Sequence, residues 1–217
     1  MTTYHILDTE TASLQGGVVE LAYLLVDDQL EIIKEFCERV NPERPIDPGA
    51  QAIHGITDDE VKGCRTLAQI AESEQLDQIN LIGHNAAFDR RIIESSVSVK
   101  RTLCSLALAR TYVKGTSNHK LQTLKAELPL PEQESHTALG DVHTVRDLLK
   151  HVLAVSEVSL ETLFERQDKP RILTVMPWGK HKGTVMLKVP REYRNWLLDQ
   201  LDLDRDLKLT LEKLKNL

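Results

Sequence analysis

The sequence is poor in cysteine and aromatic residues and has no long apolar run. Its three cysteines, Cys37, Cys64 and Cys104, are widely spaced and form no Cys-x-x-Cys pair, which argues against a disulfide framework and a structural zinc site. We therefore expect a reducing, bacterial-type cytoplasmic setting. The chain opens on strand-like residues rather than a basic and then apolar segment, so neither a secretory signal nor a membrane span is expected.

Charge is divided unevenly along the chain. The formal net charge is −6, but residues 169–217 carry 11 Lys and Arg against 6 Asp and Glu, and residues 1–168 carry 16 against 27. An acidic body with a basic tail suggests that the body holds metal and the tail meets phosphate. A chance fluctuation over so short a tail is the alternative.

Hydrophobic periodicity and turn residues predict an α/β sheet with both faces covered by helices. The capping box from Thr57 to Glu60 predicts a short helix, and the three prolines in 41–48 predict a surface loop. Predicted strands cover 4–10, 18–26, 30–40, 80–83 and 100–104, and predicted helices cover 66–75, 86–95, 105–112, 120–127 and the segment after Asp141.

The pattern divides the chain into residues 1–156, a helical linker at 157–170 and a small basic domain at 171–217. In the last part we expect a strand at 171–176, a basic loop at 177–183 and helices at 190–201 and 204–214. Both tryptophans lie there, and aromatic residues among cations suit nucleic acid, although a small core also uses large side chains. Candidate DNA-binding residues are Trp178, Lys180, Lys182, Arg191 and Arg194.

Four carboxylates adjoin apolar sequence. Asp8 and Glu10 alternate along the first strand and share a face. Asp89 lies on the apolar side of its predicted helix, and Asp141 is in register with the apolar stripe of the last long helix. A lone Asp-x-Glu is ordinarily a solvated strand end, but several semi-buried carboxylates need a cation, and hard oxygen ligands suit Mg²⁺ or Mn²⁺.

Four motifs occur in a characteristic order: Asp-x-Glu at 8–10, Ile-His-Gly-Ile-Thr at 53–57, His-Asn-x-x-Phe-Asp at 84–89 and His-x-Ala-x-x-Asp at 136–141. Over about residues 4–155 this pattern resembles the DnaQ-like, DEDDh-type 3′→5′ exonucleases. The resemblance implies a ribonuclease H-like fold, a mixed sheet flanked by helices, here with a small C-terminal α+β appendage. One departure is Ser13, where the family commonly has Gly in the loop that meets the terminal base.

The resemblance also implies a two-metal mechanism. Two Mg²⁺ ions about 4 Å apart, with Mn²⁺ able to substitute, would be held by Asp8, Glu10, Asp89 and Asp141. His136 would be the general base, because imidazole titrates near neutral pH. The expected activity is metal-dependent release of nucleoside 5′-monophosphates from DNA 3′ ends, in DNA repair.

The same motifs suggest residues that contact the substrate. Leu14 and Gln15, on the loop that leaves the first strand, would grip the 3′-terminal nucleotide, and Phe88 would stack on its base or belong to the core. His54 and His84 are better suited to supporting loops by hydrogen bonding than to catalysis. The candidate substrate-binding residues are Thr9, Thr11, Leu14, Gln15, His54, His84, Asn85 and Phe88.

Several alternatives stay open at the level of the sequence. The chain could be a proofreading subunit of a replicative DNA polymerase or an RNA 3′-trimming exoribonuclease, with the same chemistry on another substrate. A non-catalytic binding module that kept the fold is a further class. The DNA partner could be single-stranded or duplex, and a homodimer is one of the open oligomeric states.

Overall fold

A computed structural model describes residues 2–131, 137–169, 172–200, 203 and 205–215. The chain divides into two compact units, Met1–Glu165 and Arg166–Leu217, and each has a hydrophobic core. The elements in chain order are β1 (Tyr4–Ser13), β2 (Gly16–Val26), β3 (Ile32–Arg39), α1 (Pro48–His54), α2 (Asp58–Val61), α3 (Leu67–Ser73), β4 (Ile79–Gly83), α4 (Ala87–Ile93), β5 (Val99–Cys104), α5 (Ser105–Tyr112), α6 (Leu121–Glu127), α7 (Ala138–Ser156), α8 (Leu160–Asp168), a 3-10 turn η1 (Met186–Lys188), α9 (Arg191–Leu198) and α10 (Arg205–Leu214).

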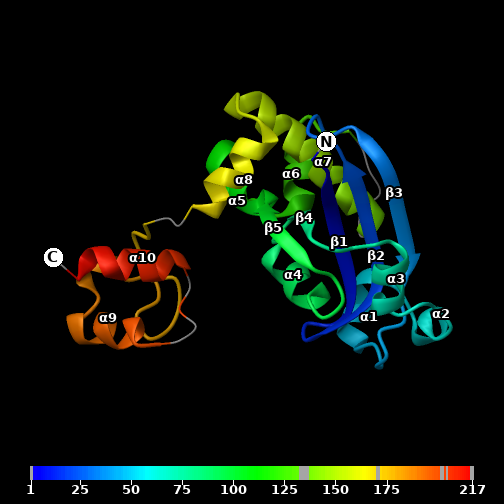
Figure 1. Cartoon of the computed structure of the whole chain (residues 1–217), viewed down its shortest axis with the longest axis horizontal. Coiled ribbons are helices and arrows are strands. Elements are labelled where there is room, and N and C mark those ends of the chain that lie inside the picture. The colour runs from blue at the N-terminus through cyan, green and yellow to red at the C-terminus, as the bar shows by residue number, and fades with distance from the viewer. Residues whose placement is uncertain (1, 132–136, 170–171, 201–202, 204, 216–217) are drawn as a thin grey trace. The chain divides into compact units, whose positions relative to one another are not determined.

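The first unit is built on a five-stranded mixed sheet with the order β3-β2-β1-β4-β5 (Figure 1). β1 pairs antiparallel with β2 and parallel with β4, and β4 pairs parallel with β5. The register between β1 and β2 shifts between Glu10 and Thr11, and such a bulge re-aims the side chains at a strand end. The mixed sheet flanked by helices confirms the predicted fold class.

Helices cover both faces of this sheet because its strands alternate between two apolar faces. Tyr4 and Ile6 pack into a core with α5, α6, α7 and α8, whereas Leu7 packs on the other face with Ile70 of α3 and Ile93 of α4. Side chains two apart point the same way in a strand. Asp8 and Glu10 therefore continue the face that carries α7. No helix among the described residues has the length and apolarity to cross a bilayer.

α8 lies inside the segment predicted to be a helical linker, 157–170, and packs on the first unit. Phe164 is fully buried there, with its ring stacked 5.2 Å from that of Tyr4. Arg101 donates two hydrogen bonds of 2.5 and 2.9 Å to the Glu161 carboxylate, which also accepts one from the Tyr4 hydroxyl at 3.1 Å. The first unit therefore extends nine residues beyond the predicted boundary, to Glu165, because α8 has an apolar face to bury.

A helix that the sequence reasoning missed, α1, starts at Pro48, where a loop was predicted to end. Proline is favoured in the first turn of a helix because the missing N–H has no partner there. In the second unit α9 and α10 confirm the two predicted helices. The predicted strand at 171–176 is reduced to one bridge, Val175 with Val185, with Arg171 outside the described residues.

Candidate active site

The carboxyl ends of the parallel strands β1 and β4 meet at one edge of the sheet, where open α/β sheets bind ligands. β4 ends at Gly83, and the chain then turns into α4, which carries Asp89. A β-carbon at Gly83 would lie 3.3 Å from Ala86 and from the Leu7 carbonyl oxygen. Glycine thus lets the start of α4 approach β1, and the approach brings Asp89 towards the Asp8 strand.

Asp89 is only 3% exposed and is held from β1. The Thr9 hydroxyl donates a 2.9 Å hydrogen bond to its Oδ1. Burial raises the pKa of Asp89, and hydrogen bonds from the Thr9 side chain and from backbone N–H groups oppose this rise. Thr9, predicted to bind substrate, therefore positions a carboxylate in this structure.

Burial and the neighbouring carboxylates both raise the pKa values of Asp8 and Glu10. Burial raises the pKa of Asp8 well above its usual range, and the charges of Asp89, Asp141 and Glu10 add to the rise. Burial, followed by the charges of Asp141, Glu20 and Asp89, raises the pKa of Glu10 to about 7. The fold thus brings the four sequence-predicted carboxylates, from β1, α4 and α7, into one region of mutual repulsion.

Two of these carboxylates point at neutral donors. Gln122 of α6 donates a 2.9 Å hydrogen bond to Asp141, as Thr9 does to Asp89. Within the described residues, no three His, Cys, Asp or Glu side chains converge closely enough to form a ready-made metal cluster. The donor set itself fits a hard divalent cation, because it consists of carboxylate oxygens whose mutual repulsion a cation would relieve.

A fifth carboxylate, Glu20, was missed by the sequence reasoning. It lies opposite Glu10 in the β1–β2 register and is 8% exposed. Its carboxylate accepts hydrogen bonds from Arg39 at 2.8 Å and from the Ala138 backbone N–H at 3.0 Å, which joins β2 to the start of α7. The available signal was its place as the one charged residue in the apolar run 18–26.

His136, the predicted general base, lies outside the described residues. The chain is described again from Thr137, the N-cap of α7, whose hydroxyl accepts a 3.1 Å hydrogen bond from the Gly140 N–H. Asp141 lies in the first turn of α7, four residues after this cap. The catalytic role of His136 stays a prediction from its motif.

The turn between β1 and β2 presents the residues predicted to meet the terminal nucleotide. The Ser13 hydroxyl accepts a 3.2 Å hydrogen bond from the Gln15 N–H, so the serine that departs from the family pattern stabilises the turn. Leu14 is 79% exposed, and Arg91 holds its carbonyl at 2.9 Å. The Arg91 guanidinium also lies 5.2 Å from the centre of the half-buried Phe88 ring.

A pocket of about 430 Å³ lies between this turn and α1. His54 closes one side: its Nδ1 accepts a 3.0 Å hydrogen bond from the Ile56 N–H, which supports the loop as expected. Its buried Nε2 has no hydrogen-bond partner among the described residues, and burial lowers the pKa of the ring. The lining residues are Glu10, Thr11, Ser13, Leu14, Asp47, Gly49, Ala50, Ile53 and His54.

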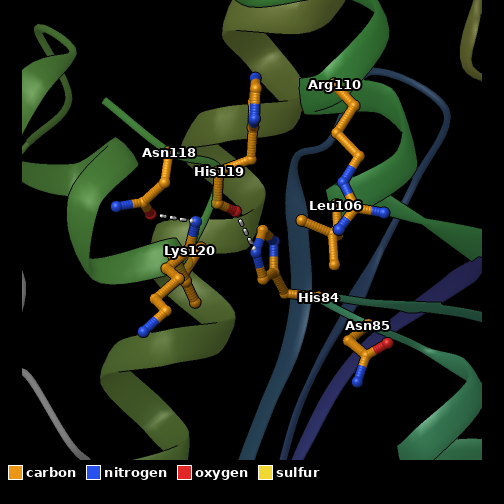
Figure 2. Close-up of a pocket in the computed structure, with 8 residues that line it drawn as sticks. His84, Asn85, Leu106, Arg110, Asn118, His119 and Lys120 are labelled. Carbon is orange, nitrogen blue, oxygen red and sulfur yellow. Dashed lines mark hydrogen bonds between the residues drawn. The ribbon is translucent and has the colours of Figure 1, made fainter. Parts of the chain in front are cut away.

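His84 organises a second pocket, of about 640 Å³ (Figure 2). Its Nε2 bonds to the His119 carbonyl at 2.9 Å and its Nδ1 to the Ser105 hydroxyl at 2.9 Å. Because a carbonyl can only accept, Nε2 carries a proton. The Ser105 hydroxyl that pairs with Nδ1 also donates a 3.3 Å hydrogen bond to the Gly83 carbonyl. Burial lowers the pKa of His84, and the charge of Arg110 adds to the decrease. His84 thus links the end of β4 to Ser105 of α5 and to the His119 backbone.

The second pocket has basic and amide side chains on its walls. In Figure 2 the Arg110 side chain extends from α5 towards His84, and Lys120 and Asn118 lie on the opposite wall. Asn85, in a left-handed backbone conformation with φ of 72°, lies at one end. Sequence reasoning named His84 and Asn85 but missed the cations, whose only signal was positive charge within an acidic body.

The chain matches known proteins along most of its length. The model of the RNase T family, described as exonucleases, matches residues 5–149. Exodeoxyribonuclease 10 of Escherichia coli strain K12 is 31% identical over 95% of this chain and 96% of that protein. The DNA polymerase III subunit epsilon-like protein of Rhodobacter capsulatus is 29% identical over 74% of this chain but only 25% of its own.

Solved structures agree with this match. Exonuclease X in complex with 5′ overhanging duplex DNA superposes with a TM-score of 0.65 and 30% identity, covering 76% of this chain and 98% of that one. The nuclease domain of 3′hExo, a DEDDh family member bound to rAMP, shares the fold at a TM-score of 0.56 and 18% identity, over 70% of this chain and 92% of that one.

Proposed function

Because the chain belongs to the RNase T family of exonucleases, we propose that it is a metal-dependent 3′→5′ exodeoxyribonuclease that releases nucleoside 5′-monophosphates. The observation that carries the proposal is the convergence of Asp8, Glu10, Asp89 and Asp141, in motif order, on one edge of the sheet. The full-length match to an exodeoxyribonuclease and the DNA bound to exonuclease X support DNA as the substrate.

The four carboxylates would hold two Mg²⁺ ions, for which Mn²⁺ can substitute. When bound, such ions supply a nucleophilic water near neutral pH and stabilise charge on the leaving oxygen. Thr9 and Gln122 would orient Asp89 and Asp141 as ligands, since carboxylates that are hydrogen-bonded on one oxygen hold their direction. His136 would take the proton of the attacking water on an imidazole nitrogen.

The 430 Å³ pocket would receive the 3′-terminal nucleotide. Leu14 and Ile53, which are 79% and 70% exposed, offer apolar surface to a base, whereas Thr11 and His54 offer polar contacts. Gln15 follows Leu14 on the same turn. Large apolar side chains exposed at a pocket rim commonly mark a ligand contact.

The second pocket would hold the strand that leads to the terminal nucleotide. Arg110 and Lys120 suit a backbone phosphate, because phosphate contacts from Arg and Lys position a nucleic acid without reading its bases. The amides of Asn85 and Asn118 add hydrogen-bond donors to the same walls. An enzyme that removes any nucleotide needs contacts of this sequence-independent kind.

An autonomous enzyme fits the chain better than a polymerase subunit. The match to Exodeoxyribonuclease 10 covers both proteins almost completely, whereas the Bacillus subtilis DNA polymerase III PolC-type relative is covered over only 11% of its length. None of the three cysteines, all within the described residues, forms a disulfide, which suits a reducing compartment. We propose a cytoplasmic location and a role in DNA repair.

A gel assay with a DNA oligonucleotide labelled at its 5′ end tests this function. With Mg²⁺ we expect a ladder that shortens stepwise from the 3′ end, lost in Asp141→Asn and kept in Asp59→Asn, an exposed acid of α2. Early release of labelled mononucleotide would reverse the polarity. A ladder on RNA alone would replace the substrate, and no cleavage of either would leave a binding module.

A further inference from the structure

Both tryptophans of the chain are exposed on the second unit. Trp178 is 42% and Trp196 is 53% exposed, and the sequence has no other tryptophan. The core of this unit is formed instead by smaller apolar residues such as Met176, Met186 and Leu197. Tryptophan is a large apolar side chain, and its exposure on a small unit indicates a surface that contacts something else.

Trp178 is carried by a loop with a defined shape. The Met176 N–H donates to Thr184 and the Gly183 N–H donates back to Met176, both at 2.8 Å, so the two ends of the loop 177–183 are paired. Gly179 has a φ of 75°, and a β-carbon there would lie 2.8 Å from the Tyr193 hydroxyl. The loop is therefore closed at its base and lies directly on α9.

The contact between loop and helix continues as a row of rings. The His181 ring meets Tyr193 edge-on with centres 4.7 Å apart, and Tyr193 meets Trp196 at 5.4 Å. Tyr193 and Trp196 are three residues apart on α9 and so lie on one side of it. The row begins at the loop that carries Trp178 and ends at the exposed indole of Trp196.

The same loop carries Lys180 and Lys182, which are exposed and make no ion pair with described residues. The segment 169–217 has 11 Lys and Arg against 6 Asp and Glu. Cationic and aromatic side chains together suit single-stranded nucleic acid, whose phosphates are negatively charged and whose bases are free to stack.

We propose that this aromatic–basic surface, formed by Trp178, Lys180, Lys182, Tyr193 and Trp196, binds single-stranded DNA. Bases would stack on the indoles while the lysines neutralise phosphates. A single strand fits better than a duplex, whose bases are already stacked on one another. This surface would be a second DNA site, separate from the proposed hydrolytic one. The inference rests on the proposed function only for the choice of DNA over RNA. Binding at this surface needs neither metal nor cleavage.

Intrinsic tryptophan fluorescence tests the proposal, because every tryptophan of the chain lies on this surface. The full chain would be titrated with oligothymidylate in EDTA, which prevents cleavage. We expect saturable quenching, a loss of about five-fold or more in affinity for Trp196→Ala, and near-normal affinity for Trp196→Phe, which keeps an aromatic face. Unchanged affinity in Trp196→Ala would overturn the proposal.

The lysines give a second readout that misfolding does not imitate. Lys180→Ala and Lys182→Ala should each reduce the slope of log affinity against log salt by about 0.7. Lys188→Ala, an exposed lysine outside the loop, is the matched control and should leave the slope unchanged. A slope that is the same in all three variants would contradict the proposed phosphate contacts.

Two further experiments distinguish failure of this proposal from failure of the proposed exonuclease function. Hydrolysis of a dinucleotide by Trp196→Ala should stay at the wild-type rate, so that loss of binding with normal hydrolysis supports the surface. Normal quenching without any hydrolysis would overturn only the proposed function. Equal quenching by oligouridylate would replace DNA by single-stranded nucleic acid in general, and quenching by neither oligonucleotide would leave a protein partner and refute the proposal.

Discussion

Replacing His5 by a side chain that does not titrate should reduce the loss in free energy of unfolding as the pH falls below about 6.5. His5 lies on β1, three residues before Asp8, with its ring 5.3 Å from that of Tyr23. Its Nδ1 is buried and has no hydrogen-bond partner among the described residues. Burial, with a smaller contribution from the charge of Lys34, lowers its pKa from 6.5 to about 4. The native state therefore keeps this ring neutral where the unfolded state would protonate it.

The sign and size follow from proton linkage. The folded pKa is depressed, so the stability is fully present above pH 6.5 and is lost as pH falls from there towards 4. A shift of one pKa unit corresponds to about 1.4 kcal/mol. Between about pH 7.5 and pH 5 the wild type should lose about 2 kcal/mol through this histidine alone.

Urea unfolding at a series of pH values measures this difference. His5→Phe keeps an aromatic ring beside Tyr23 and cannot titrate, so its stability should fall less than that of the wild type over the same range. The quantity to compare is the difference between the two curves, since other groups titrate equally in both proteins. If the curves stay parallel from pH 7.5 to 5, to within about 0.5 kcal/mol, the burial of a neutral His5 is refuted.

Three further substitutions test other parts of the structure. Arg110→Ala should raise KM for single-stranded DNA at unchanged kcat and reduce the salt slope of binding by about 0.7; Lys114→Ala, outside the pocket, should change neither. Arg101→Ala should lower the free energy of unfolding by about 1–2 kcal/mol in urea, because Glu161 loses a bidentate partner that is only partly exposed; unchanged stability would contradict that role. Gly179→Ala should destabilise the second unit by about 1–2 kcal/mol, since a left-handed position acquires a β-carbon, and melting followed by tryptophan fluorescence would detect it; an unchanged melting curve would count against the tight loop–helix contact.

Local sequence carried the prediction of the strands, most helices and the order of the acidic motifs. Asp8 and Glu10 alternate on a strand, and Asp141 is in register with an apolar stripe. The spacing of these residues therefore predicts which face of its element each side chain occupies. Pro48 shows the limit of this reasoning: it read as the end of a loop but is the first residue of α1, because proline serves either role.

The contacts between distant elements could not be predicted in this way. The hydrogen bonds from Thr9 to Asp89 and from Gln122 to Asp141 join segments that meet only when the sheet and helices assemble. The basic pocket at Arg110 depends likewise on how α5 lies against the turn after β4. Contacts between residues so far apart in the chain leave no periodic pattern in the local sequence, so a single sequence does not predict them.

α8, which lies in the segment predicted to be a helical linker, shows a different limit of the sequence. A polar, charged segment with a few apolar residues reads as a linker when its partner surface is unknown. Phe164 packs against Tyr4, some 160 positions earlier in the chain, and the burial of such a ring stabilises the helix on the first unit. The same residues would form a solvated helix if that apolar face were absent.

Asp8, Glu10, Asp89 and Asp141 are proposed to form one catalytic metal centre. Titration with Mn²⁺, with the free ion counted by electron paramagnetic resonance, measures this directly. We expect the wild type to bind two ions in the presence of an oligonucleotide, and Asp8→Asn to lose this binding together with exonuclease activity while it stays folded. Identical Mn²⁺ binding by the wild type and Asp8→Asn would contradict the claim.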